Sequence, residues 1–114
     1  MTVKYLEIVT NELDSTCALY EQLYGVPFAP RDPTLGQARV AHKPDGTLIG
    51  IREPLAEHES PIVRAYLAVD DIEQAAKAAE DGGAMVAYPP TREGEHGVFA
   101  IVIKDGVQHG LWQR

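Results

Sequence analysis

Apolar and polar positions along this chain follow two patterns, a strand-like alternation and a helical period, which recur in a fixed order. Alternation with apolar residues at every second position marks strand-like segments at the N-terminus and again around residues 62–69. Each segment leads into a polar cap and then a helical pattern of about ten residues, which ends at Gly25 in the first case and at Gly82 in the second. The sequence therefore predicts the same strand and helix twice.

Two Asp-Gly pairs, at residues 45–46 and 105–106, each separate two further strand-like segments. Asp-Gly between alternating segments indicates a hairpin, because both central residues of a type I′ turn need positive φ. Four residues after each turn glycine comes another glycine, Gly50 in the first hairpin and Gly110 in the second.

The two halves of the chain match as a duplicated module. Each half also contains a proline-bearing extended stretch between its helix and its hairpin, so each predicts β-α-β-β-β. This content is typical of an α+β fold in which one helix covers one face of each sheet. We expect a single domain of two modules, residues 1–56 and 61–114, joined by residues 53–61. The pattern does not determine the conformation of residues 26–36 and 86–97.

Alternation also assigns each strand residue to a face of its sheet. Leu6 and Ile8 are expected to pack on the helix, and a two-residue turn would place Arg39 opposite Arg52 on the other face. That non-helix face then carries nine candidate ligand-binding residues: Tyr5, Glu7, Arg39, Arg52, Arg64, Tyr66, Phe99, Gln108 and Trp112. Aromatic rings beside charges are typical of a small-molecule pocket. A subunit interface is the alternative interpretation.

Composition excludes some classes of function. A net charge of −7, with basic residues scattered along the chain, argues against nucleic acid as a partner. No apolar segment approaches the roughly 18 residues of a membrane span, and the N-terminus lacks signal-peptide features. The single cysteine, Cys17, cannot form an internal disulfide and lies in a helical pattern, which predicts a buried packing role and a cytoplasmic protein.

Three segments resemble the vicinal oxygen chelate superfamily, which includes glyoxalase I, extradiol dioxygenases and bleomycin resistance proteins. They are LDSTCALYEQLYGV, VDDIEQAAKAAEDGGA and the closing DGVQHGLWQ, and their order and spacing extend the resemblance over essentially the whole chain. The resemblance implies two β-α-β-β-β modules that form a curved, barrel-like mixed sheet with the helices outside. It is closest to small bacterial members of the glyoxalase/bleomycin resistance protein/dioxygenase group.

In the metal-dependent members of this superfamily, each module supplies one metal ligand from its first strand and one from its last. Those positions fall here on Tyr5, Gly50, Arg64 and Gly110. Glycine has no side chain to offer, arginine stays protonated, and neutral tyrosine is a poor ligand for the usual ions. We therefore expect no metal and no other cofactor.

The remaining candidates for chemistry are Glu7 and His96. Glu7 is the only acid assigned to the non-helix face, where it would form an ion pair with an arginine, contact a ligand or act as a general base. The three arginines would hold an anionic ligand or lie in water. His96, in a loop between glycines, would move a proton or remain a solvated loop residue. His109 is assigned to the helix side, opposite Val102.

These observations favour a protein that binds or sequesters a small molecule and, by the resemblance, pairs into a homodimer. The alternative is a metal-independent enzyme, isomerase-like or lyase-like, in which Glu7 or His96 transfers a proton. A metal-dependent lyase or dioxygenase is disfavoured by the residues at the ligand positions.

Overall fold

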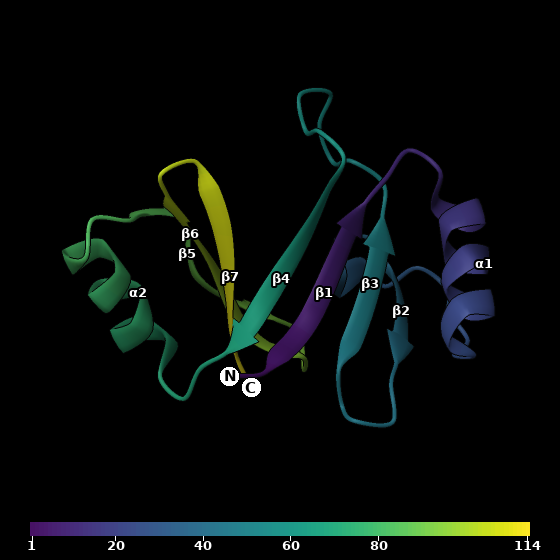
Figure 1. Cartoon of the computed structure of the whole chain (residues 1–114), viewed down its shortest axis with the longest axis horizontal. Coiled ribbons are helices and arrows are strands. Elements are labelled where there is room, and N and C mark those ends of the chain that lie inside the picture. The colour runs from purple at the N-terminus through teal and green to yellow at the C-terminus, as the bar shows by residue number, and fades with distance from the viewer. The chain divides into compact units, whose positions relative to one another are not determined.

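The computed structural model describes all 114 residues, which form seven strands and two α-helices in two units (Figure 1). The first unit is Tyr5–Val63, and the second combines Met1–Lys4 with Arg64–Arg114. Each unit contains β-strands and one α-helix, which is the α+β class expected from the sequence. No helix is both long enough and apolar enough to cross a membrane.

The first unit contains β1 (Val3–Val9), α1 (Leu13–Tyr24), a short 3-10 helix η1 (Pro33–Leu35), β2 (Arg39–His42) and β3 (Leu48–Arg52). Its strands lie in the order β2-β3-β1, with β1 parallel to β3 and β2 antiparallel to it. The core between sheet and helix is apolar, and it contains Ile8, Leu13, Cys17, Phe28, Ile49 and Ile51 with Leu6 packed against it. Leu6 and Ile8 therefore lie on the predicted face. Burial also raises the pKa of the Cys17 thiol, in keeping with a packing role.

The second unit contains β4 (Ile62–Ala68), α2 (Ile72–Asp81), β5 (Met85–Glu93), β6 (Gly97–Lys104) and β7 (Val107–Gln113). Its strands lie in the order β4-β7-β6-β5, with β4 parallel to β7 and the other pairs antiparallel. Helix α2 packs along β5, β6 and β7 (Figure 1). The predicted β-α-β-β-β order is complete in this half of the chain.

Both helices end where the sequence indicates, and α2 also begins at its predicted cap. The polar cap expected for α1 was Asn11, but α1 begins after Glu12, whose side chain makes no capping hydrogen bond. The Asp71 side chain caps α2 by accepting a hydrogen bond from the backbone N–H of Gln74 at 3.1 Å. Helix α1 ends at Gly25, whose φ of 67° is the left-handed conformation that glycine adopts without a steric penalty.

The first half lacks one strand that the repeat predicts. Residues 26–36 contain η1 and no strand, so no strand precedes the hairpin. Pro27, Pro30 and Pro33 interrupt this segment, and a proline cannot donate a ladder hydrogen bond. In the second half, Pro89 and Pro90 are accommodated because β5 is at the end of its unit's strand order and carries register shifts.

The second hairpin follows the predicted register. Lys104 pairs with Val107 across a two-residue turn, in which Asp105 and Gly106 have φ values of 51° and 81°. Phe99 therefore lies opposite Trp112, and His109 lies opposite Val102 as expected, with its side chain exposed.

The first hairpin is offset by one residue from the predicted register. The Lys43 N–H donates to the Thr47 carbonyl at 2.9 Å, which leaves a three-residue turn instead of the expected two. The physical reason is Pro44, which lacks the N–H that a two-residue turn would use and instead favours the first central position of a type I turn. Arg39 consequently pairs with Ile51 and not with Arg52.

The predicted face of Arg39 is therefore wrong. Its side chain reaches the helix side of the first unit, where Nε donates to the Ala29 carbonyl at 3.0 Å and a terminal nitrogen donates to the Phe28 carbonyl at 3.1 Å. A further contact joins it to Asp14 at 3.3 Å. Arg39 therefore fixes the segment that follows α1.

We predict that Arg39→Ala lowers the free energy of unfolding by about 1–3 kcal/mol, because the Phe28 and Ala29 carbonyl groups lose their donor and the hydrogen bond to Phe28 is partly buried. Urea unfolding followed by circular dichroism measures this change. Asp14→Ala is the matched control: it removes only the exposed ion pair and should cost less than about 1 kcal/mol. Equal costs for the two variants would contradict the anchoring role.

Candidate functional site

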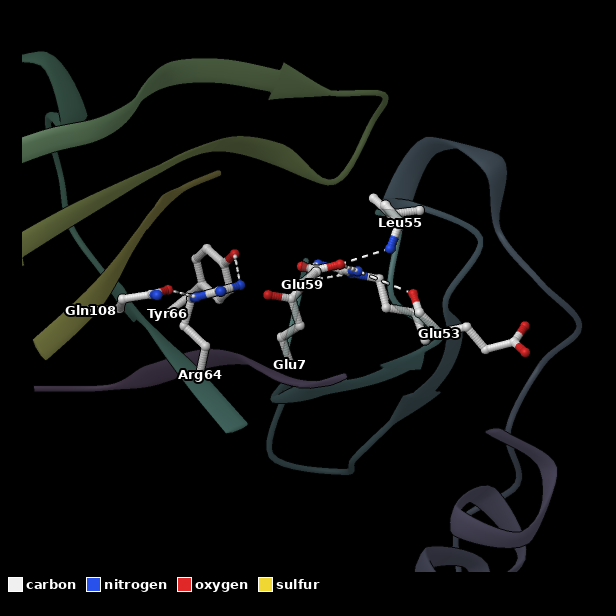
Figure 2. A network of polar contacts seen from close by, with 8 residues as sticks. Glu7, Glu53, Leu55, Glu59, Arg64, Tyr66 and Gln108 are labelled. Carbon is white, nitrogen blue, oxygen red and sulfur yellow. Dashed lines mark hydrogen bonds and ion pairs between the residues drawn. The ribbon is translucent and has the colours of Figure 1, made fainter. Parts of the chain in front are cut away.

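On the non-helix face of the first unit, Arg52 is the centre of a buried network of charges. Its Nε donates to Glu7 Oε2 at 2.9 Å, and its terminal nitrogens donate to the two carboxylate oxygens of Glu59 at 2.8 and 2.7 Å (Figure 2). The Arg52 and Glu7 side chains are only 7% and 10% exposed. The hydrogen bonds that Arg52 donates to Glu59, and then the charge of Glu7, raise the pKa of Arg52 despite its burial.

Glu59 is the member of this network that the sequence did not reveal. It lies in the segment expected to be a simple joint, yet its carboxylate also accepts the Leu55 backbone N–H at 2.7 Å. Arg52 in turn donates to the Glu53 carbonyl at 3.2 Å. The joint thus wraps back over the end of β3. No periodic pattern marks such a contact, because it depends on the path of an irregular segment.

Glu7 therefore has the structural partner that was one of its predicted alternatives. A buried carboxylate needs compensation, and Arg52 supplies both charge and a hydrogen bond. No buried side-chain nitrogen or oxygen atom in the protein lacks a hydrogen-bond partner. Glu7, Arg52 and Glu59 consequently form a closed ionic network in the first unit. Through this network Arg52 holds β1, β3 and the segment after β3 together.

We predict that Arg52→Met lowers the free energy of unfolding by on the order of 3–5 kcal/mol, because it leaves two carboxylates without their shared cation. Arg31→Met is the matched control, since Arg31 pairs with Glu53 at 2.7 Å but both side chains are about half exposed. That control should cost less than about 1 kcal/mol. Chemical denaturation of both variants measures the difference, and similar values would contradict a structural role for Arg52.

The second unit presents an aromatic cluster, which we define as Tyr66, Tyr88, Phe99 and Trp112. Tyr88 stacks on Phe99 with ring centroids 4.9 Å apart and planes 20° apart, and Phe99 lies 6.3 Å from Trp112 at 31°. Tyr66 meets both Phe99 and Trp112 edge to face. Tyr66 and Trp112 are buried, Phe99 is half-buried, and Tyr88 is 43% exposed. These arrangements are the favourable ones for aromatic pairs.

Polar groups lie at one edge of the aromatic cluster. Arg64 Nε donates to Gln108 Oε1 at 2.8 Å, and Arg64 also contacts the Tyr66 hydroxyl at 3.5 Å (Figure 2). Arg64 is 8% exposed, whereas Gln108 is exposed. Five predicted ligand-binding residues are thereby placed together in one unit: Arg64, Tyr66, Phe99, Gln108 and Trp112.

Tyr88 joins these residues although the sequence did not assign it to a face. It pairs with Ile101, which shares the face of Phe99. Its strand shows register shifts between Val86 and Tyr88 and again between Tyr88 and Thr91. Simple alternation cannot follow such shifts, and the two prolines after Tyr88 are the only sequence signal that they occur.

His96 lies in the turn between β5 and β6, where its backbone has a clear structural use. The Trp112 indole N–H donates to the His96 carbonyl at 3.1 Å, and the His96 N–H donates to the Glu93 carbonyl at 3.0 Å. The turn therefore satisfies the one polar group of the Trp112 ring.

The positions at which the superfamily resemblance places metal ligands, which include Gly50 and Gly110, do not fit a metal in either unit. In the first unit, a Cβ added to Gly50 would overlap the ring and hydroxyl of Tyr5. In the second, a Cβ added to Gly110 would lie 2.5 Å from the Tyr66 ring and 2.7 Å from the Ala65 carbonyl. A tyrosine of the first strand thus fills the place that a ligand side chain would need. No three His, Cys, Asp or Glu side chains gather as around an ion.

We predict that Gly50→Ala destabilises the protein by about 1–3 kcal/mol, because its methyl group would have to displace the buried Tyr5 ring. Gly82→Ala is the matched control, since a Cβ there meets only ordinary contacts and its φ of −84° suits any residue. Thermal unfolding of the two variants provides the measurement. A Gly50→Ala variant as stable as Gly82→Ala would show that Tyr5 does not occupy this space.

The fold has well-defined structural neighbours. A hypothetical protein from Bacillus halodurans matches with a TM-score of 0.75 at 15% identity, over 99% of this chain and 94% of that one. Methylmalonyl-CoA epimerase from Mycobacterium tuberculosis also gives 0.75 at 15% identity, over 96% and 85%. The Streptomyces coelicolor methylmalonyl-CoA epimerase, in complex with 2-nitronate-propionyl-CoA, gives 0.71 at 19% identity, over 99% and 94%. No family model and no curated protein matches the sequence.

The chain thus shares its glyoxalase-type α+β fold with the methylmalonyl-CoA epimerases. The fold expected from the sequence is confirmed. At identities of 20% or less, this likeness concerns the fold and not the chemistry.

Proposed function

We propose that this protein binds a small organic molecule on the aromatic cluster of the second unit and does so without a metal ion. The observation that carries the proposal is the composition of that surface. It combines partly exposed stacked rings with a buried arginine and an exposed amide, which is the mixture of apolar area and a few orienting polar groups that small-molecule sites use.

Two further observations support a metal-independent function. Tyrosine rings fill the space beside Gly50 and Gly110, so neither unit offers the paired ligands that metal-dependent relatives use. The structural neighbours include an epimerase in complex with methylmalonyl-CoA, which supports a small organic molecule as the partner of this fold. Binding or sequestration is the function that these features favour.

We predict saturable binding that divalent-ion chelation does not change. Trp112 is the only tryptophan and lies in the aromatic cluster, so its fluorescence should report occupancy directly. The screen would use aliphatic acids, aromatic acids and acyl-CoA esters, with EDTA present and absent. Phe99→Ala should weaken binding at least about tenfold by removing one stacked ring. Leu19→Ala, on the exposed surface of α1, is the control.

Three results would contradict this proposal. They are the absence of binding across the screen, binding that requires an added divalent ion, and unchanged affinity in a folded Phe99→Ala variant. Circular dichroism of Phe99→Ala would establish that the variant is folded. Because Phe99→Ala removes a half-buried ring, Gln108→Ala provides a second variant at an exposed position.

The second candidate is a metal-independent isomerase, which the epimerase neighbours favour. Glu7 would be its base, although the carboxylate is engaged by Arg52 at 2.9 Å. Methylmalonyl-CoA incubated with the protein in D2O distinguishes the two candidates. The isomerase would be established if deuterium uptake at the carbon between the two carbonyl groups is faster than without protein and is abolished in Glu7→Gln. Uptake equal to that of the protein-free sample leaves binding as the function.

A further inference from the structure

A row of three side chains crosses the non-helix face of the second unit and changes from apolar to polar. Met85 on β5 pairs with Ile103 on β6, and Ile103 pairs with Gln108 on β7. Directly paired residues share a face of the sheet, and Ile103 lies on the face of Phe99 because it is four residues further along β6. Met85 is 60% exposed, Gln108 is exposed and Ile103 is half-buried. We call Met85, Ile103 and Gln108 the cross-strand row.

The apolar end of the cross-strand row offers aliphatic surface. Neither Met85 nor Ile103 has a charged group or a hydrogen-bond donor in its side chain. The neighbouring pair extends this apolar surface along the strands, since Tyr88 lies directly opposite Ile101. Covering exposed apolar area is favourable because it removes that area from water, and the unbranched methionine side chain can adapt to the shape of what covers it. This end of the row therefore suits an aliphatic chain.

The polar end of the cross-strand row offers hydrogen-bond donors. Gln108 Oε1 accepts from Arg64 Nε at 2.8 Å, since a guanidinium group can only donate (Figure 2). The two donors of the Gln108 NH2 group are therefore the part of this exposed amide that can meet a ligand. Arg64 is buried and also contacts the Tyr66 hydroxyl, so we assign it the role of orienting the amide. The matching group on a ligand is an acceptor, and a carbonyl oxygen meets this need without a negative charge.

The strand spacing sets the length of this surface. From β7 to β6 is about 5 Å, and from β7 to β5 is about 10 Å. A carbonyl group held by Gln108 would therefore place a chain of about four carbons over Ile103, and a chain of about eight carbons would reach Met85. Beyond Met85 there is no further strand in this unit, because β5 is the last strand in its order. Carbons beyond about the eighth would extend into water.

We propose that the ligand is a linear aliphatic carbonyl compound of about eight carbons, which lies along the cross-strand row with its carbonyl oxygen on Gln108 and its chain over Ile103 and Met85. This inference rests on the proposed binding function and specifies its ligand class. The chain lies beside the aromatic cluster, with Tyr88 along one side. Phe99 acts on the ligand through Tyr88, on which it stacks.

A series of N,N-dimethyl amides of the linear four-, six-, eight- and ten-carbon acids tests this proposal by isothermal titration calorimetry. These amides share one acceptor carbonyl, have no charge and differ only in chain length. We expect the affinity to rise about twofold per added methylene from four to eight carbons, because a chain on an open face buries about half of its area. The ten-carbon amide should bind no more than about 1.5-fold more tightly than the eight-carbon amide.

Two variants assign the two ends of the row. Met85→Ser should leave binding of the four-carbon amide unchanged and weaken binding of the eight-carbon amide about threefold, because only the longer chain reaches this position. Gln108→Glu, which keeps the acceptor for Arg64 and removes the donors, should weaken binding of every amide at least about fivefold. Leu19→Ser is the control, because Leu19 is also an exposed apolar residue, at 50%, but lies on α1 of the first unit. It should bind all four amides as the unaltered protein does.

Affinities that do not depend on chain length, or that rise equally from eight to ten carbons, would overturn the inference. If Met85→Ser alters only the sedimentation of the protein and not its affinities, a second copy covers the row instead of a ligand, and the inference is also wrong. If no amide binds while an aromatic acid or acyl-CoA ester from the screen does, the ligand class is wrong and the binding function stands. If no compound of the screen binds either, the proposed function itself fails.

Discussion

The packing of a tyrosine ring against a glycine is the constraint on which the non-helix face of each unit depends. Tyr5 covers Gly50 in the first unit, and Tyr66 covers Gly110 in the second. In each unit the glycine makes room for the ring, and the ring occupies the space that a metal ligand would use.

The non-helix faces of the two units carry different contacts. In the first unit, Arg52 is shared between two carboxylates, which stabilises the path of the segment after β3. In the second unit, Arg64 donates to the Gln108 amide and contacts the Tyr66 hydroxyl, beside a partly exposed stack of rings. An ionic network is thus the main feature of the first unit, and an aromatic cluster is the main feature of the second.

Local patterns predicted much of the fold because local physics determines it. The helix ends at Gly25 and Asp71, and the second hairpin with its Asp-Gly turn, were correct. The first hairpin was not, since Pro44 changes the turn by one residue and thereby moves Arg39 to the other face. A one-residue change inverts every side chain of a strand. Five site candidates were brought together in the second unit, and Tyr88 was missed because its strand shifts register.

The sequence by itself determined the repeated strand and helix, the β-α-β-β-β order of the second half, the faces of β1, β6 and β7, and the absence of ligating side chains at Gly50 and Gly110, because each follows from periodicity or residue chemistry. Only the tertiary structure decided that Glu59 pairs with Arg52, that tyrosine rings fill the space above the glycines, and that Tyr88 extends the stack. The first and third of these contacts depend on an irregular segment and on a shifted strand, and the second depends on side-chain packing between regular strands, so none of them gives a repeating signal in the sequence.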